Sequence, residues 1–177
     1  MEIRLTPNGK NRTKEVVDAL LHMQSGTTLV FEKGTYDFYL DGAYRGYFFI
    51  GCNRSGEKRV VFPLLNLKNV TIDGNGSSFI FHDRIFPFVT QNCENVTLKN
   101  FSIDFSFPRC LEAVAGKTDE NGFELYVDEK YGCTVNDKGN LLIPAGSETF
   151  SSSERRYFLE QKNWHCFISV GDIITKT

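Results

Sequence analysis

Tryptophan and proline are rare in this chain of 177 residues, which contains one Trp and five Pro. No stretch of about 18 apolar residues occurs, so neither a transmembrane helix nor membrane contact is expected. Basic residues form no run longer than two, as at Lys58-Arg59, and the net charge is −2 at pH 7. The chain therefore lacks the basic footprint of a nucleic-acid-binding protein. The absence of an apolar secretion signal at the N-terminus predicts a cytoplasmic protein, or a periplasmic or secreted one if a leader is missing.

Motifs for metals and cofactors are also absent. The cysteines form no CxxC pair and the nearest two are 17 positions apart, so no metal site is expected. There is no P-loop, dinucleotide-binding fingerprint or Ser/His/Asp motif, and the sequence gives no reason to expect a cofactor. We interpret the cysteines as reduced thiols that are buried as small apolar side chains. They are Cys52, Cys93, Cys110, Cys133 and Cys166.

Aromatic residues and glycine are abundant instead. The 16 Phe, seven Tyr and 15 Gly residues favour many short strands separated by tight turns. One helix is predicted from Thr13 to Met23, with Asn11 as its cap and Gly26 as a left-handed residue at its end. The apolar face of this helix comprises Val16, Val17, Leu20, Leu21 and Met23.

Strands are expected directly after this helix, at residues 28–32 and 35–39, because apolar and polar residues alternate there. Residues 41–58 are expected to form a loop or a short hairpin. A helix followed by such strands is typical of the start of a parallel β-helix. The helix covers the apolar interior of the first coil, which would otherwise face water.

Residues 59–108 repeat with a period of 26. Alternation within each copy predicts strands, with inward apolar and outward polar side chains. The matched pairs are Phe62 with Phe88, Asn69 with Asn95, Val70 with Val96, Ile72 with Leu98, Phe79 with Phe105, and Phe81 with Phe107. We therefore predict an all-β fold, a right-handed parallel β-helix in which the paired apolar residues stack and the paired asparagines form a ladder at a turn.

The pattern of apolar and turn-forming residues changes after Pro108. Strands at 110–116 and 123–128 flank a turn and predict an antiparallel hairpin, and a short strand is expected at 141–144. Polar residues at 147–154 predict a loop, and further strands are expected at 157–160 and 166–170. Two domains are therefore expected. Residues 1–108 hold the capping helix and first coils, and residues 109–177 hold a small barrel-like antiparallel subdomain and the start of a return to the β-helix. The last residues resemble a strand in progress, so we expect a truncated chain.

Three segments resemble the N-terminal portion of glycoside hydrolase family 110, and the resemblance spans roughly residues 10–145. These segments are TLVFEKGTYDFY, KRVVFPLLNLKNVTIDGNGSSFIFHDRIFPFV and NVTLKNFSIDFSFPR. The family comprises exo-acting α-1,3-galactosidases. The resemblance therefore implies inverting hydrolysis of galactose-terminated glycans, which requires two carboxyl groups about 6.5–9.5 Å apart. In the family these carboxylates lie in later coils, which implies that they lie beyond Thr177 and that this chain alone does not complete the reaction.

No catalytic residue is assigned from the sequence, but four residues are candidates for substrate binding. Asp104 is expected on the outward face of a strand, where a sugar could bind, or where it could simply be solvated or paired with Arg109. His82 and Arg84 belong, together with Asp83, to a polar cluster that either lines a groove or forms an exposed loop between coils. Asp73 is interpreted as a turn-capping residue.

Two other functions stay open. One is a different polysaccharide-active β-helix enzyme, such as a polygalacturonase or pectate lyase. The paired-Asp motif and basic cluster expected of these enzymes are missing, and the net charge of −2 does not suit a polyanionic substrate. The other is a non-catalytic glycan-binding β-helix module.

Overall fold

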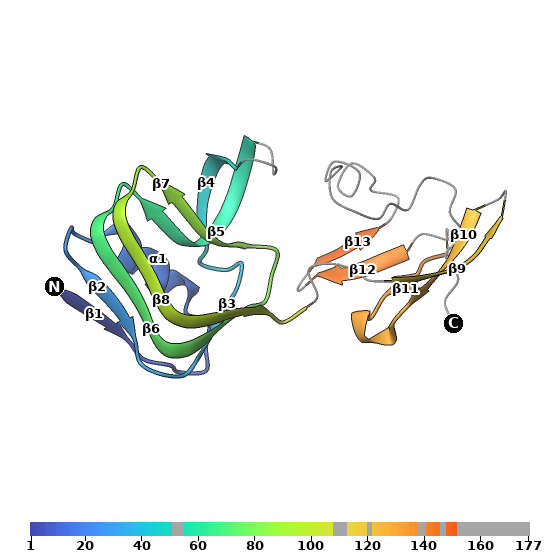
Figure 1. The fold of residues 1–177 in the computed structure, drawn as a ribbon, viewed down its shortest axis with the longest axis horizontal. Helices are drawn as coiled ribbons and strands as arrows, with labels where there is room; N and C mark the ends of the chain where they lie inside the picture. The colour runs from blue at the N-terminus through green and yellow to red at the C-terminus, as the bar shows by residue number, and fades with distance from the viewer. Residues whose placement is uncertain (51–54, 108–112, 120–121, 138–140, 146–147, 152–177) are drawn as a thin grey trace. The chain divides into compact units, whose positions relative to one another are not determined.

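A computed structural model describes residues 1–50, 55–107, 113–119, 122–137, 141–145 and 148–151. Most of these residues lie in strands, and the chain divides into two compact units, Met1–Ser106 and a second that begins at Phe107. The first unit is a parallel β-solenoid of about four turns (Figure 1), so the predicted fold class is confirmed. No helix in the described part of the chain is both long and apolar enough to span a membrane.

The first sheet of the solenoid is entirely parallel. β1 pairs with β2, while β2 and β3 pair with the two halves of the long strand β6, which in turn pairs with β8. Val70 lies opposite Val96 and Ile72 opposite Leu98, which confirms the predicted ladders. The strands are β1 (Glu2–Leu5), β2 (Thr28–Phe31), β3 (Thr35–Phe38), β6 (Lys68–Phe81) and β8 (Glu94–Phe105).

The second sheet consists of β4 (Tyr44–Phe49), β5 (Ser55–Leu65) and β7 (Phe86–Gln91). β5 and β7 are parallel, and Phe62 lies opposite Phe88 as the repeat predicts. The two rings stack with centroids 4.4 Å apart. β4 pairs with β5 in antiparallel orientation. Of the loop and the short hairpin predicted for residues 41–58, the hairpin is therefore correct.

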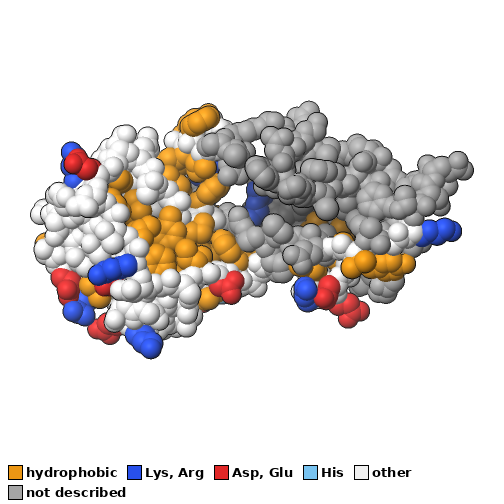
Figure 2. All heavy atoms as spheres, in the orientation of Figure 1, with side chains coloured by type: hydrophobic (Ala, Val, Ile, Leu, Met, Phe, Trp, Pro, Cys, Tyr) orange, Lys and Arg blue, Asp and Glu red, His pale blue; other side chains and the backbone are white. Residues whose placement is uncertain are grey.

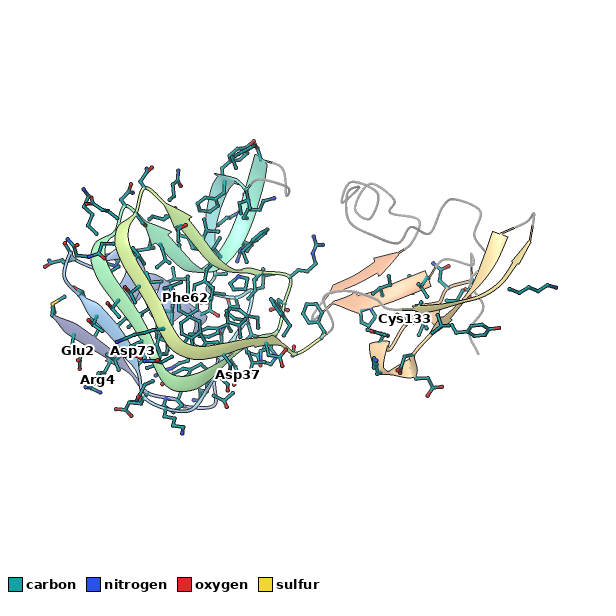
Figure 3. All side chains as sticks on the ribbon, in the orientation of Figure 1. Glu2, Arg4, Asp37, Phe62, Asp73 and Cys133 are labelled. Carbon is teal, nitrogen blue, oxygen red and sulfur yellow. The ribbon has the colours of Figure 1, made fainter. Side chains whose placement is uncertain are left out.

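Aromatic rings fill the space between the two sheets. Figure 3 shows Phe62 among these side chains. Phe79 is fully buried, and its ring centroid lies 4.7 Å from that of Phe31 and 5.5 Å from that of Phe62. The fully buried aromatic residues are Phe31, Tyr36, Phe38, Phe62, Phe79 and Phe81. Burial of apolar area and contacts between rings therefore hold the coils together.

The helix α1 (Thr13–Leu21) packs against β5 and contributes Val16 and Leu20 to the core. It is shorter than predicted, and Leu21 was wrongly assigned to the apolar face, since 44% of this residue is exposed. The N-cap residue is Arg12 and not the predicted Asn11. The backbone N–H of Thr13 nevertheless donates to Oδ1 of Asn11, the residue before the cap, over 2.9 Å. Gly26 has a positive φ of 78°, but it follows the last helical residue by five positions.

The predicted asparagine ladder is confirmed. Asn69 and Asn95 have positive φ values of 52° and 53°. The Nδ2 atom of Asn95 donates to Oδ1 of Asn69 over 2.8 Å. The same arrangement recurs at a second turn, where Nδ2 of Asn92 donates to Oδ1 of Asn66 over 3.3 Å. Asparagine tolerates left-handed backbone angles, so each coil can turn at the same place and bond to the coil below.

The spacing of the repeat changes within the pair β6–β8. Asp73 lies opposite Lys99, a separation of 26, but Ser77 lies opposite Phe101, a separation of 24. The predicted pairings of Phe79 with Phe105 and Phe81 with Phe107 are therefore wrong. The observed partners are Ile103 for Phe79 and Phe105 for Phe81.

Two additional residues at a corner of β6 cause this change. β6 turns through Asn75 and Gly76, whose φ values are 50° and 77°, while β8 turns at Asn100 with a φ of 61°. The longer corner shifts every later pair by two residues without reversing which side chains face inward. Ile103 thus continues the inward row as predicted, but 47% of it is exposed because no described strand covers the outer edge of β8.

Asp73 organises this corner, as its predicted capping role requires. Its Oδ1 accepts hydrogen bonds from the Asn75 backbone N–H at 2.9 Å and from Nδ2 of Asn100 at 3.0 Å. Its Oδ2 lies 3.2 Å from Nζ of Lys99. The Asn75 hydrogen bond, followed by that from Asn100, lowers the pKa of Asp73 below its usual value.

We expect Asp73→Ala to lower the free energy of unfolding at pH 7 by about 1–3 kcal/mol, because three donors lose an ionised acceptor. A lowered folded-state pKa means that this contribution is complete above the unfolded pKa of about 3.9 and disappears as pH falls through the lower, folded value. Urea unfolding of both proteins between pH 7 and pH 3 measures the effect. The difference should shrink in acid, and a difference independent of pH would contradict the assignment.

The second unit contains antiparallel strands. β9 (Ala113–Asp119) pairs with β10 (Gly122–Val127), which confirms the predicted hairpin. The short 3₁₀ helix η2 (Glu129–Tyr131) follows. β12 (Leu141–Ala145) is the short strand expected there, and it pairs with β11 (Thr134–Val135) and β13 (Glu148–Ser151).

The loop predicted at 147–154 was wrong over the four residues of β13. A polar segment lacks the apolar alternation that marks a strand, yet its backbone can still pair with β12 as an edge strand. The strands expected at 157–160 and 166–170 lie outside the described residues.

The two described cysteines, Cys93 and Cys133, are free and half-buried, so the predicted complete burial is not found. The Sγ of Cys93 donates to the Leu64 carbonyl over 3.1 Å. Burial raises the pKa of Cys133 above its usual value, which favours the protonated thiol. Cys52, Cys110 and Cys166 lie outside the described residues.

Candidate functional site

Polar side chains gather on the outer face of the first sheet, where β3, β6 and β8 end. Phe38, Phe81 and Phe105 lie in register across these strands and face the core. Side chains alternate along a strand, so the residues before and after each of these phenylalanines face outward. Two outward rows result, one with Asp37, Ile80 and Asp104, the other with Tyr39, His82 and Ser106.

His82 links the first two of these coils. Its Nε2 lies 2.7 Å from Oδ1 of Asp37, which Figure 3 labels. A carboxylate only accepts hydrogen bonds, so Nε2 carries the proton and donates to Asp37. The imidazole also stacks on the ring of Tyr39, with centroids 4.2 Å apart and planes 6° apart. The side chain of His82 remains 23% exposed. Its ring is held in place both by the hydrogen bond to Asp37 and by the stacking on Tyr39.

Asp104 lies on the same outer face and is exposed, as predicted. Its Oδ1 accepts a hydrogen bond from the backbone N–H of Phe105 over 2.8 Å, which leaves the second oxygen toward solvent. Ile80 separates Asp104 from Asp37 along the row. Two strand spacings place the backbones of the two aspartates about 10 Å apart. This face therefore presents two carboxylates, an imidazole and a phenol to solvent.

The other predicted residues differ in their placement. Arg84 follows β6 and is half-buried. Asp83, its neighbour in the predicted polar cluster, is buried, and its Oδ2 accepts a hydrogen bond from the Leu40 backbone N–H over 2.6 Å. Asp83 therefore connects two coils rather than lining a groove. Arg109 lies outside the described residues.

Asp37 and Tyr39 are the members of this cluster that sequence reasoning missed. The signal was present in the alternation of TYDFY at 35–39, which places both residues on the outer face once Phe38 is assigned inward. Among the described residues, no three His, Cys, Asp or Glu side chains come together as a metal site.

The coiled architecture and the polar outer face define a parallel β-solenoid protein. No family model matches the chain. It is 40% identical over 127 residues to α-1,3-galactosidase B of Phocaeicola vulgatus, an alignment that covers 71% of this chain and 21% of that protein. It is 38% identical over 123 residues to α-1,3-galactosidase B of Bacteroides thetaiotaomicron, covering 68% of this chain and 20% of that protein.

The similarity extends to α-1,3-galactosidase A of Shewanella woodyi, with 41% identity over 105 residues that cover 59% of this chain and 17% of that protein. These matches confirm the resemblance predicted from the sequence: the chain corresponds to an N-terminal portion of the α-1,3-galactosidase family. The aligned region spans about a fifth of the length of these curated relatives.

Proposed function

We propose that this chain forms the N-terminal part of an inverting exo-α-1,3-galactosidase and that it binds the galactose-terminated glycan on which such an enzyme acts. The observation that carries the proposal is the 40% identity to an α-1,3-galactosidase over 71% of the chain. The β-solenoid supports it further, because stacked coils generate a long, regular outer face on which a linear glycan can lie. We further propose that the solenoid ends near residue 108, where an antiparallel subdomain starts.

The sugar-binding residues proposed are Asp104, His82 and Arg84, together with Arg109. Carboxylate, imidazole and guanidinium groups match the hydroxyls of a neutral sugar, because they supply both acceptors and donors. Asp37 positions His82, since its carboxylate accepts the Nε2 proton and leaves Nδ1 for a ligand.

The catalytic carboxylates are proposed to lie outside the described residues. The spacing of about 10 Å between the strands that carry Asp37 and Asp104 is near the upper limit for an inverting pair. However, Asp37 already accepts a hydrogen bond from His82, so it is engaged in positioning that ring rather than in activating water. We therefore assign these two carboxylates to binding and support.

Titration of the isotopically labelled chain with α-D-galactosyl-(1→3)-D-galactose tests the proposal by two-dimensional NMR. We expect saturable shifts in the resonances of His82 and Asp104, and about tenfold weaker binding by His82→Ala, which loses its hydrogen bonds to the sugar. Leu21→Ala, an exposed change on α1, serves as the matched control and should bind normally.

Polygalacturonate is the discriminating ligand. Shifts at the same residues with this polyanion, and none with the galactose disaccharide, would contradict the proposal in favour of a pectin-active β-helix. Release of galactose by the chain would place the catalytic pair within it. Binding of the disaccharide without release of galactose would mean that the chain contributes glycan binding, and not catalysis, to the proposed activity.

A further inference from the structure

Two aromatic side chains on β4 are almost completely exposed. Tyr47 is 76% exposed and Phe49 is 79% exposed, which makes them the most exposed large apolar side chains in the described part of the chain. Figure 2 shows hydrophobic side chains, in orange, over the β4–β5 hairpin. Aromatic residues usually contribute buried area to a core or to an interface, so two adjacent exposed rings require an explanation other than packing.

The core does not need these rings. Phe48, between them, is buried with only 6% of its surface exposed, and it anchors the hairpin beside Tyr44, whose ring centroid lies 6.2 Å away. Alternation along β4 then places Tyr47 and Phe49 on the opposite, outward face. Polar residues at both positions would satisfy the hairpin equally well.

The two rings lie on the same face of β4, with polar groups beside them. Residues two apart on a strand are separated by about 7 Å, so the rings of Tyr47 and Phe49 can each lie under one of two consecutive pyranose units. Glu57 lies opposite Tyr47 on β5, and its Oε1 is 2.7 Å from Nε of Arg45. This ion pair is exposed and electrically balanced, which suits a neutral ligand whose hydroxyls both donate and accept hydrogen bonds.

We propose that Tyr47 and Phe49 form a second carbohydrate-binding site, separate from the outer face of the first sheet, that takes a neutral galactose-terminated disaccharide. The ligand class rests on the proposed function, while the site itself rests on the geometry of the hairpin. Galactose has an axial 4-hydroxyl on one face of the ring, which leaves the C–H groups at C3, C4 and C5 together on the opposite face. This face packs on an aromatic ring, and Glu57 and Arg45 bind hydroxyls at the edge of the sugar.

Saturation-transfer-difference NMR of the full chain with α-D-galactosyl-(1→3)-D-galactose tests the site. Irradiation of aromatic protein protons should transfer saturation most strongly to the H3, H4 and H5 protons of galactose. We expect Tyr47→Ala and Phe49→Ala each to weaken binding at this site by about tenfold. Tyr47→Phe and Phe49→Tyr keep the rings and should retain binding, as should Leu21→Ala, an exposed apolar control. These side chains are exposed, so the circular dichroism spectra should be unchanged.

An unchanged saturation pattern in the double variant Tyr47→Ala/Phe49→Ala would overturn the inference, as would the absence of any transfer from the wild-type chain to the sugar. The two proposals fail separately. If only the shifts at His82 and Asp104 respond to the sugar, the hairpin site is refuted and the proposed function stands. If only the hairpin variants change binding, the outer-face site is refuted and this inference stands.

Discussion

Replacing Phe79 with alanine is expected to lower the free energy of unfolding of the solenoid unit by about 3–5 kcal/mol. Phe79 is fully buried at the centre of the aromatic core, so truncation removes its transfer energy and leaves a cavity that rigid neighbouring strands cannot fill. Its ring lies next to those of Phe31, Tyr36, Phe38, Phe62 and Phe101.

Urea unfolding followed by circular dichroism measures this loss. The matched control is Phe49→Ala, the same chemical change at a residue that is 79% exposed, which should alter stability by less than about 0.5 kcal/mol. Because total stabilities are about 5–15 kcal/mol, Phe79→Ala should leave the unit marginally stable. Equal losses for the two variants would mean that the rings do not form the core described.

Replacing Gly74 with alanine is expected to cost about 1–3 kcal/mol or more, although the change adds a single methyl group. A Cβ at this position would lie 2.4 Å from Cβ of Phe101 and 2.7 Å from the carbonyl oxygen of Asn100. Both atoms are held at or near the backbone of β8, so no flexible side chain can move aside. The glycine therefore lets the coil of β8 pass directly over the corner of β6.

The comparison with Gly56→Ala isolates this effect. Gly56 is also in a strand, but the nearest atom to an added Cβ is the flexible Nζ of Lys58 at 3.8 Å. This variant should unfold at nearly the same urea concentration as the wild-type chain. In Gly74→Ala, amide resonances of β8 should shift more than those of β2, which pairs with β6 on its opposite edge. Similar destabilisation by both variants would contradict the close approach of β6 and β8.

The repeat in the sequence was sufficient to predict the solenoid because apolar stacking imposes it directly. Val70 must lie over a residue of similar shape, and the residue 26 positions later is also valine. The turn asparagines are predictable for a related reason, since Asn69 and Asn95 both adopt left-handed angles and bond to one another.

The change of period from 26 to 24 was not predictable from the same pattern. A corner can contain one left-handed residue, as at Asn100, or two, as at Asn75 and Gly76, without altering which side chains face inward. Self-alignment at a constant offset therefore placed Phe79 over the wrong partner. The fold tolerates the difference because the apolar rows are restored immediately after the turn.

The candidate site was predictable only in part, for a different reason. Outward residues have no packing constraint, so their identity need not repeat between coils. Asp104 was identified by its position in a regular strand. Asp37 was not identified, because its contact with His82 joins residues that are 45 positions apart in the sequence. The next coil has no similar Asp–His pair that a repeat could reveal. Such a pair becomes visible only when the first coil is placed on the second.

The central claim is that consecutive coils stack in register, and methyl–methyl nuclear Overhauser effects test it most directly. In a sample with labelled Val, Leu and Ile methyl groups, the account predicts strong cross-peaks between Val70 and Val96 and between Ile72 and Leu98. The absence of both, or strong cross-peaks from Val70 to methyl groups outside this register, would contradict the account.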